Sequence, residues 1–235
     1  MDEQFHQYNP GAVAVSGNSI VAVGSQSSLE AEYSAAQKID CAGKVLMPGL
    51  INAHTHVPMT LLRGLADDLR LDVWLMGYMM PVEREFVSPD FVRLGTQLAC
   101  AEMIRSGTGA AADMYYFSDS VAQAALETGF RLNFCCDAKQ TDASGNPQVA
   151  PEILERQLNQ YQNHPSGLLR VSLLVHSVYL YPQVIYPQLA QLARQLNCAV
   201  QVHVAETRPE VEECRQKYGC KPACQTHPPD LYFPG

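Results

Sequence analysis

The sequence has no long apolar run and few basic residues. No apolar stretch approaches the ~20 residues that a membrane-spanning helix requires. Lysine and arginine number 16 against 24 acidic residues, and the net charge of −8 argues against nucleic acid or an anionic membrane as the main partner. The first ten residues, MDEQFHQYNP, are acidic and polar, which does not fit a secretory signal. We therefore expect a cytoplasmic protein with no nucleic-acid partner and no membrane partner.

The sequence also lacks the usual cysteine patterns of zinc fingers. Four of the eight cysteines lie in apolar helix or strand patterns, namely Cys100, Cys135, Cys136 and Cys198. We expect these to be small buried hydrophobes in a reducing compartment. A C-terminal group with the spacing C-x5-C-x3-C-x2-H is formed by Cys214, Cys220, Cys224 and His227. Its residue types suit zinc but its spacing does not, so we expect no structural metal there.

The chain divides into a short β-rich start and a longer alternating region. Residues 11–24 predict a hairpin around Gly17 and Asn18, and residues 38–49 predict a second short β stretch. Apolar strands are then expected at 46–54, 109–116, 131–138, 168–177 and 198–206. Helices are expected at 88–107, 119–128, 151–163, 182–196 and 208–218. This alternation predicts an α/β fold with a mainly parallel sheet, either an open doubly wound sheet or a (β/α)8 barrel.

Histidines gather at the expected strand ends. His54 and His56 close the run LMPGLINAHTH, and side chains at i and i+2 of a strand point to the same face. His176 ends the fourth expected strand, and His203 with Glu206 ends the fifth. Functional groups of parallel α/β folds collect at the carboxyl ends of strands, so this placement predicts a metal site. The remaining three histidines are expected to be ordinary surface or turn residues: His6, His164 and His227.

Four segments carry a resemblance to a known family. PGLINAHTH, LRGLADDL, ADMY and VHVAET resemble the amidohydrolase superfamily, and most closely its 5-methylthioadenosine/S-adenosylhomocysteine deaminase and triazine chlorohydrolase group. The resemblance implies an incomplete (β/α)8 TIM-type barrel of about five βα units over residues 46–219. Residues 1–45 would then belong to a flanking β-sandwich, and residues 220–235 form a proline-rich tail without a period.

The resemblance also implies roles for individual residues. His54, His56 and His203 would bind one divalent metal ion, zinc in the first place and iron or manganese as alternatives. Glu206 would be the catalytic general acid/base. Two further residues would bind substrate, namely Glu83 and His176.

The implied reaction is hydrolytic deamination of an aminated purine-type compound by metal-bound hydroxide. The substrate would be a small heterocycle such as 5-methylthioadenosine or S-adenosylhomocysteine, and the protein would be a possible homo-oligomer. Three alternatives stay open: a triazine-type chlorohydrolase or aminohydrolase, a catalytically incompetent fragment of such an enzyme, and an open five-stranded binding domain.

The chain departs from the family in its C-terminal part. The family's histidine after the sixth strand and its aspartate after the eighth cannot be assigned, because the pattern ends after the fifth βα unit. We therefore expect a truncated chain with little or no turnover.

Overall fold

The computed structural model describes residues 5–177 and 179–223. The chain divides into two compact units, Met1–Pro48 and Gly49–Gly235, which we call the N-terminal unit and the barrel unit. None of the helices in the described ranges combines the length and apolar character needed to cross a membrane.

The N-terminal unit is built on a hairpin. Strands β1 (Gly11–Ser16) and β2 (Ser19–Ser25) pair antiparallel, and Gly17 at their turn has a φ of +57°. Helix α1 (Gln26–Glu32) follows directly, and the side chain of Ser25 caps it by accepting a hydrogen bond from the backbone N–H of Ser28. The hairpin prediction is thus confirmed, while α1 was not predicted.

The second β stretch predicted for this unit is wrong. Residues 38–49 contain no strand, and a turn closed by the Lys44 N–H and the Cys41 carbonyl interrupts them. Ile39 and Val45 are exposed. A strand forms only where a neighbour satisfies its backbone groups, and β-rich composition alone does not supply that neighbour.

The barrel unit contains one parallel sheet of five strands. These are β3 (Leu50–Thr55), β4 (Thr108–Asp113), β5 (Arg131–Cys136), β8 (Leu169–Ser177) and β9 (Ala199–His203), in that spatial order. Each neighbouring pair is parallel, for example Ala111 opposite Leu132 and Phe134 opposite Val171. The sheet is curled into a half-barrel, and the carboxyl ends of its first and last strands meet at His54 and His203. The barrel prediction is confirmed and the open-sheet alternative is wrong.

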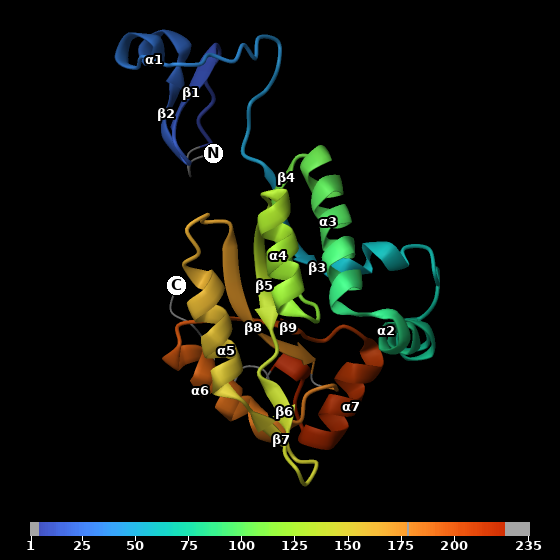
Figure 1. The fold of residues 1–235 in the computed structure, drawn as a ribbon. Helices are drawn as coiled ribbons and strands as arrows, with labels where there is room; N and C mark the ends of the chain where they lie inside the picture. The colour runs from blue at the N-terminus through green and yellow to red at the C-terminus, as the bar shows by residue number, and fades with distance from the viewer. Residues whose placement is uncertain (1–4, 178, 224–235) are drawn as a thin grey trace. The chain divides into compact units, whose positions relative to one another are not determined.

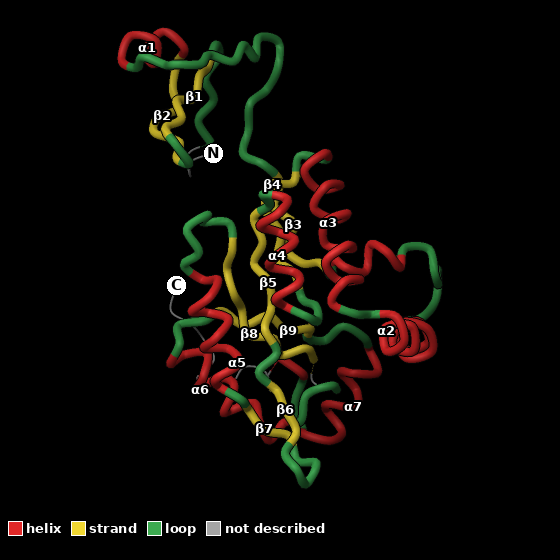
Figure 2. Tube along the Cα trace, viewed as in Figure 1, coloured by secondary structure: helices red, strands yellow, loops and turns green. Residues whose placement is uncertain are grey.

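Helices cover the outer face of the half-barrel. They are α3 (Pro89–Arg105), α4 (Ser118–Thr128), α5 (Pro151–Gln157), α6 (Tyr186–Gln195) and α7 (Arg208–Tyr218). A further helix, α2 (Met80–Phe86), packs on the π-helical segment Val73–Met79 that precedes it. Figures 1 and 2 show α3 and α4 side by side against the strands. The predicted helix at 151–163 is observed as α5 followed by a π-helical segment at Leu158–Gln162.

The core lies between these helices and the sheet. Phe134 and Leu173 point into it, while the next residue on each strand, Cys135 and Leu174, points to the inner face and packs with Met114. This alternation follows from the two-residue period of a strand. The four cysteines expected to be buried, Cys100, Cys135, Cys136 and Cys198, are all buried.

Three shorter elements complete the unit. A 3₁₀-helix, η1 (Val57–Leu62), follows the histidine pair, a π-helix, η2 (Val73–Met79), leads into α2, and β6 (Lys139–Thr141) pairs with β7 (Pro147–Val149) in a small hairpin. These elements and α2 were not predicted from the sequence.

Candidate metal centre

Three histidines converge at the carboxyl ends of the two edge strands. His54 lies in β3, His56 immediately follows that strand, and His203 is the last residue of β9. One ring nitrogen from each residue lies within 4.8 Å of the other two. The Nε2 atoms of His54 and His203 are 3.3 Å apart, close to the ~3.4 Å expected for two imidazole nitrogens on one tetrahedral zinc ion.

Backbone carbonyl groups fix the orientation of two of these rings. The Nδ1 atom of His56 lies 2.6 Å from the Met114 carbonyl oxygen, and that of His203 lies 2.9 Å from the His176 carbonyl oxygen. A carbonyl oxygen only accepts, so both Nδ1 atoms carry a proton, and in the neutral ring Nε2 is the nitrogen with the free lone pair. This arrangement, with the outer ring nitrogen donating to the protein, is typical of metal-binding histidines. The three side chains therefore fit a metal ion.

The surroundings favour neutral imidazoles. Burial lowers the pKa of His56 and of His54, and the neighbouring His203 adds to the effect at both residues. Burial likewise lowers the pKa of His176 to about 4. These rings are neutral at pH 7, and neutral imidazole is the form that binds metal ions.

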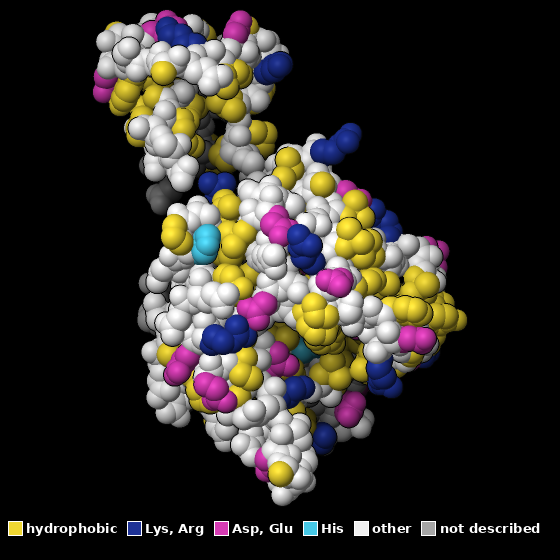
Figure 3. All heavy atoms as spheres, in the orientation of Figure 1, with side chains coloured by type: hydrophobic (Ala, Val, Ile, Leu, Met, Phe, Trp, Pro, Cys, Tyr) yellow, Lys and Arg dark blue, Asp and Glu magenta, His cyan; other side chains and the backbone are white. Residues whose placement is uncertain are grey.

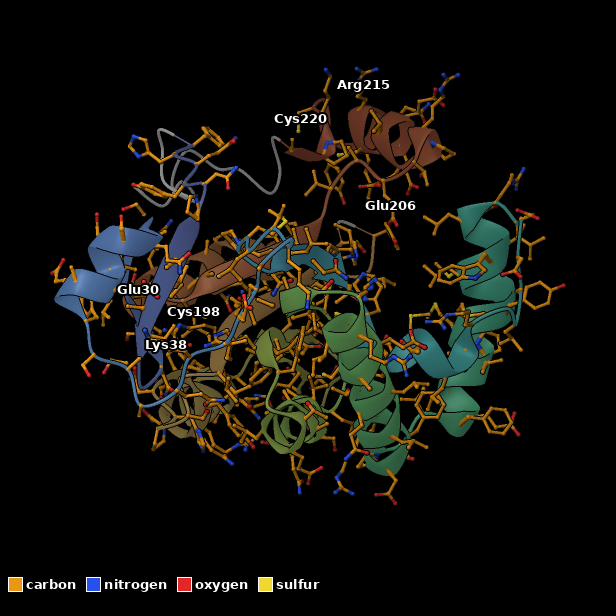
Figure 4. The ribbon with its side chains drawn as sticks, turned by 90° about the horizontal axis from the view of Figure 1, so that it is seen from above. Glu30, Lys38, Cys198, Glu206, Arg215 and Cys220 are labelled. Carbon is orange, nitrogen blue, oxygen red and sulfur yellow. The ribbon has the colours of Figure 1, made fainter. Side chains whose placement is uncertain are left out.

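Glu206 lies on the segment that joins β9 to α7 (Figure 4). Its Oε2 atom accepts a hydrogen bond of 3.1 Å from the Tyr179 hydroxyl. The backbone N–H groups of Ala205 and Glu206 donate to the Glu210 carboxylate, which also forms a capping box with Thr207. The start of α7 thus holds the backbone of Glu206 next to His203, while its side chain stays exposed.

The two expected substrate-binding residues lie at the same end of the sheet or near it. The His176 ring, at the end of β8, is 4.7 Å from the His203 ring between centroids. Glu83 lies in the first turn of α2 and is half-buried, and its Oε1 atom accepts a hydrogen bond of 2.7 Å from the Tyr115 hydroxyl. Burial raises the pKa of Glu83.

Asp113 was not predicted as a site residue from the sequence. This last residue of β4 is fully buried, and its Oδ1 atom accepts a hydrogen bond of 2.7 Å from the Val57 N–H, directly after His56. Within the described residues its Oδ2 atom is buried without a hydrogen-bond partner. Burial raises the pKa of Asp113 to about 7. Its position at the end of an expected strand, in the segment ADMY, was the sequence signal that could have identified it.

A hollow by strands β3 and β9 is lined by Ala53, His54, Met114, Val200, Gln201, Val202 and His203. It lies against two of the converging histidines. Among the residues that the structure describes, His54, His56 and His203 form the group of side chains that can hold a metal. The C-terminal group of Cys214, Cys220, Cys224 and His227 lies partly outside the described residues, since these end at residue 223.

Comparison with curated proteins finds deaminases. A 5-methylthioadenosine/S-adenosylhomocysteine deaminase from Acetivibrio thermocellus is 41% identical over 198 residues, which cover 83% of this chain and 45% of that protein. The chain spans about half the length of the curated relatives it matches.

Comparison with solved structures finds a deaminase and a chlorohydrolase. An adenosine deaminase from Xanthomonas campestris with bound zinc superimposes with a TM-score of 0.83 at 35% identity, over 94% of this chain and 50% of that one. An atrazine chlorohydrolase from Arthrobacter aurescens complexed with zinc has a TM-score of 0.77 at 21% identity, over 91% of this chain and 52% of that one, and shares the fold.

The match to a family model covers most of the chain. Residues 45–232 match the model of the amidohydrolase family, and this range contains the entire half-barrel with its three converging histidines. The chain belongs to the amidohydrolase family.

Proposed function

We propose that this chain carries the metal site and the proton-transfer group of a hydrolytic deaminase. Its substrate would be an aminated purine-type compound, 5-methylthioadenosine or S-adenosylhomocysteine. The observation that supports this proposal is the convergence of His54, His56 and His203 within 4.8 Å, with Glu206 three residues after His203. The deaminases among the relatives support the substrate class.

His54, His56 and His203 would hold one divalent ion, with zinc as the first choice because three imidazoles leave a fourth tetrahedral position for water. A bound zinc ion lowers the pKa of such a water to about 7. Water adds to the ring carbon that bears the amino group, and ammonia leaves that carbon.

Glu206 would move the protons of this reaction. Its carboxylate takes one proton from the attacking water and returns it to a ring nitrogen or to the departing amine. The Tyr179 hydroxyl already occupies one oxygen of the carboxylate, so the other oxygen is available for this transfer. The clamp formed by Glu210 on the backbone of Ala205 and Glu206 keeps the group beside the histidines.

Glu83 and His176 would contact the substrate. Glu83 presents a half-buried carboxylate, which accepts hydrogen bonds from hydroxyl or N–H groups. His176 is neutral at pH 7 and lies against His203 on the inner face, where it would bind the heterocycle by one donor or acceptor nitrogen.

The test compares ammonia release by the zinc-loaded chain and its Glu206→Gln variant, with 5-methylthioadenosine and S-adenosylhomocysteine as substrates. We expect slow but measurable release by the parent chain, because the family's histidine after the sixth strand and aspartate after the eighth are not assigned in it, and a loss of about 100-fold or more in the variant. Glu213→Gln, on the exposed side of α7, is the matched control and should keep full release. Equal release by Glu206→Gln, or a zinc-loaded parent that releases no ammonia, would contradict the proposal.

An aminated triazine serves as the comparison substrate in the same assay. The likeness to the atrazine chlorohydrolase shows the fold alone, since the two sequences are 21% identical. Release from the triazine without release from the nucleosides would move the substrate assignment to the triazine class.

A further inference from the structure

We propose that Tyr115 is a positioning residue for Glu83, and that it presents the free oxygen of this carboxylate to a hydroxyl or N–H donor of a nucleoside-type substrate. This inference rests on the function proposed above and adds a residue to its binding site.

A hydrogen bond joins the side chains of Tyr115 and Glu83. The Tyr115 hydroxyl donates to Oε1 of Glu83 over 2.7 Å, and the two residues come from separate elements. Tyr115 follows β4 by two residues, whereas Glu83 lies in α2. The bond therefore ties a short helix to the carboxyl end of the sheet.

The two ends of this bond differ in rigidity. The Tyr115 side chain is buried, with 7% of its surface exposed, and it belongs to the main core. Helix α2 contributes no fully buried residue, and Glu83 itself is half-buried. Because the tyrosine is held by the core and the glutamate is not, Tyr115 sets the orientation of the carboxylate rather than the reverse.

Tyr115 lies beside the histidine centre. The Tyr115 ring is 6.5 Å from the His56 ring between centroids, and the preceding residue, Met114, accepts the Nδ1 proton of His56. A molecule bound at the centre would therefore lie next to Tyr115, whose hydroxyl is bonded to Glu83. A carboxylate offers about four acceptor positions on two oxygens, so Oε2 of Glu83 remains open after Oε1 is engaged.

The hydroxyl also affects the charge of Glu83. Burial raises the pKa of this carboxyl, and the hydrogen bond from Tyr115 lowers it. Removal of the hydroxyl would thus favour the protonated form, which is a poorer acceptor for a substrate hydroxyl. The hydrogen bond from Tyr115 therefore orients the Glu83 carboxylate and also favours its charged form.

The first test measures the carboxyl of Glu83 directly and needs no turnover. The pKa of Glu83 is followed by carbon-13 NMR of the full-length chain labelled at glutamate, with the signal assigned by its loss in Glu83→Gln. We expect the pKa to rise in Tyr115→Phe and to stay at the parent value in Tyr116→Phe, which removes a neighbouring hydroxyl whose ring is 5.1 Å from that of Tyr115. An unchanged pKa in Tyr115→Phe would overturn the proposal.

The second test uses steady-state kinetics with 5-methylthioadenosine on the zinc-loaded chain. Tyr115→Phe should raise KM about tenfold or more with a smaller effect on kcat, while Tyr116→Phe should leave both near the parent values. An unchanged KM in Tyr115→Phe would overturn the assignment.

Two further outcomes keep the proposals separate. A zinc-loaded parent chain that releases no ammonia refutes the proposed function, while the NMR titration still decides whether Tyr115 controls Glu83. If Tyr115→Phe does not fold, hydrogen exchange of the Tyr115 hydroxyl proton is compared between the parent chain and Glu83→Ala. Protection that is lost in Glu83→Ala supports the pairing, and equal protection refutes it.

Discussion

At the scale of single residues, Asp113 organises the segment that carries the histidine pair. It accepts the N–H of Val57, the residue after His56, and it immediately precedes Met114, whose carbonyl accepts the Nδ1 proton of His56. A buried carboxylate without full hydrogen bonding costs stability, and such groups persist where they hold a functional segment. We interpret Asp113 as the residue that fixes the chain direction directly after the histidine pair.

This interpretation predicts a pH dependence in the metal-free chain. The pKa of Asp113 is raised by burial from 3.8 to about 7, so the folded chain holds its proton more tightly than the unfolded chain does. The stabilisation that the bound proton gives to the folded chain is fully present below pH ~4. As the pH rises to about 7 the free energy of unfolding falls by up to about 4 kcal/mol for this reason. Urea denaturation should therefore show that Asp113→Asn gains stability relative to the parent as the pH is raised across this window.

The control for this measurement is Asp67→Asn, which removes an exposed carboxylate. The free energy of unfolding of this variant should change with pH in the same way as that of the parent chain. A stability difference between Asp113→Asn and the parent that is the same at pH 4 and pH 7.5 would contradict the account.

At the scale of elements, close packing of α3 on η1 holds the segment that follows the histidine pair. A Cβ atom built on Gly95 of α3 would lie 2.8 Å from the Pro58 Cα atom in η1, a separation at which backbone has to move. Gly95 is buried, and Val57 of η1 and Val92 of α3 belong to the main core beside it. The missing side chain at this position is what allows the two elements to touch.

Gly95→Ala is therefore expected to destabilise the chain by about 1–3 kcal/mol, despite the higher helix propensity of alanine. Gly77→Ala is the matched control, because a Cβ atom there meets nothing within 4 Å. The control should be neutral or slightly stabilising in the same denaturation experiment. A Gly95→Ala variant as stable as the control would show that the contact can relax.

At the scale of the whole barrel unit, the sheet has two edges. Within the described residues β3 and β9 each pair with a single neighbour, and Leu50 and Ile51 on β3 are exposed, Ile51 to 76%. Figure 3 shows more hydrophobic side chains gathered over α2 and α3. Phe86 of α2 and Leu94 of α3 are exposed. Unpaired strand edges and apolar patches of this kind promote association between chains.

Ile51→Lys should therefore reduce self-association, because a lysine on an edge strand opposes pairing with another strand. Light scattering over a range of protein concentrations measures the effect. Ile39→Lys, an exposed position in the N-terminal unit, is the control and should associate as the parent does. Equal association of Ile51→Lys and the parent would show that this edge is not the contact.

The strand-end histidines were predictable from sequence because the relevant signal is local. His54 and His56 close an apolar run, and His203 closes another, so their common edge follows from the parallel sheet. Their meeting at 3.3 Å was not predictable in the same way, since it depends on how far the sheet curls. The curl of the sheet into a barrel was expected only from the resemblance to the amidohydrolase family.

The supporting residues were beyond the sequence analysis for a physical reason. Asp113 and Tyr115 act through partners 56 and 32 positions away, and nothing in the local pattern around them reports those contacts. The helix that carries Glu83 follows a π-helical segment, whose spacing does not match the period used to predict helices. Residues 38–49 show the opposite case. Their sequence has a β-like local pattern, but no neighbouring strand pairs with them and no strand forms.

The most direct test of the account is the zinc affinity of the chain. Calorimetry at pH 7 should find one zinc ion per parent chain, and His203→Asn should weaken binding by about 100-fold or more, because a direct ligand matters at least as much as its supporting contacts. His164→Asn, outside the cluster, should bind as the parent does. Equal zinc affinity in the parent chain and in His203→Asn would contradict the assignment of His54, His56 and His203 as one metal site.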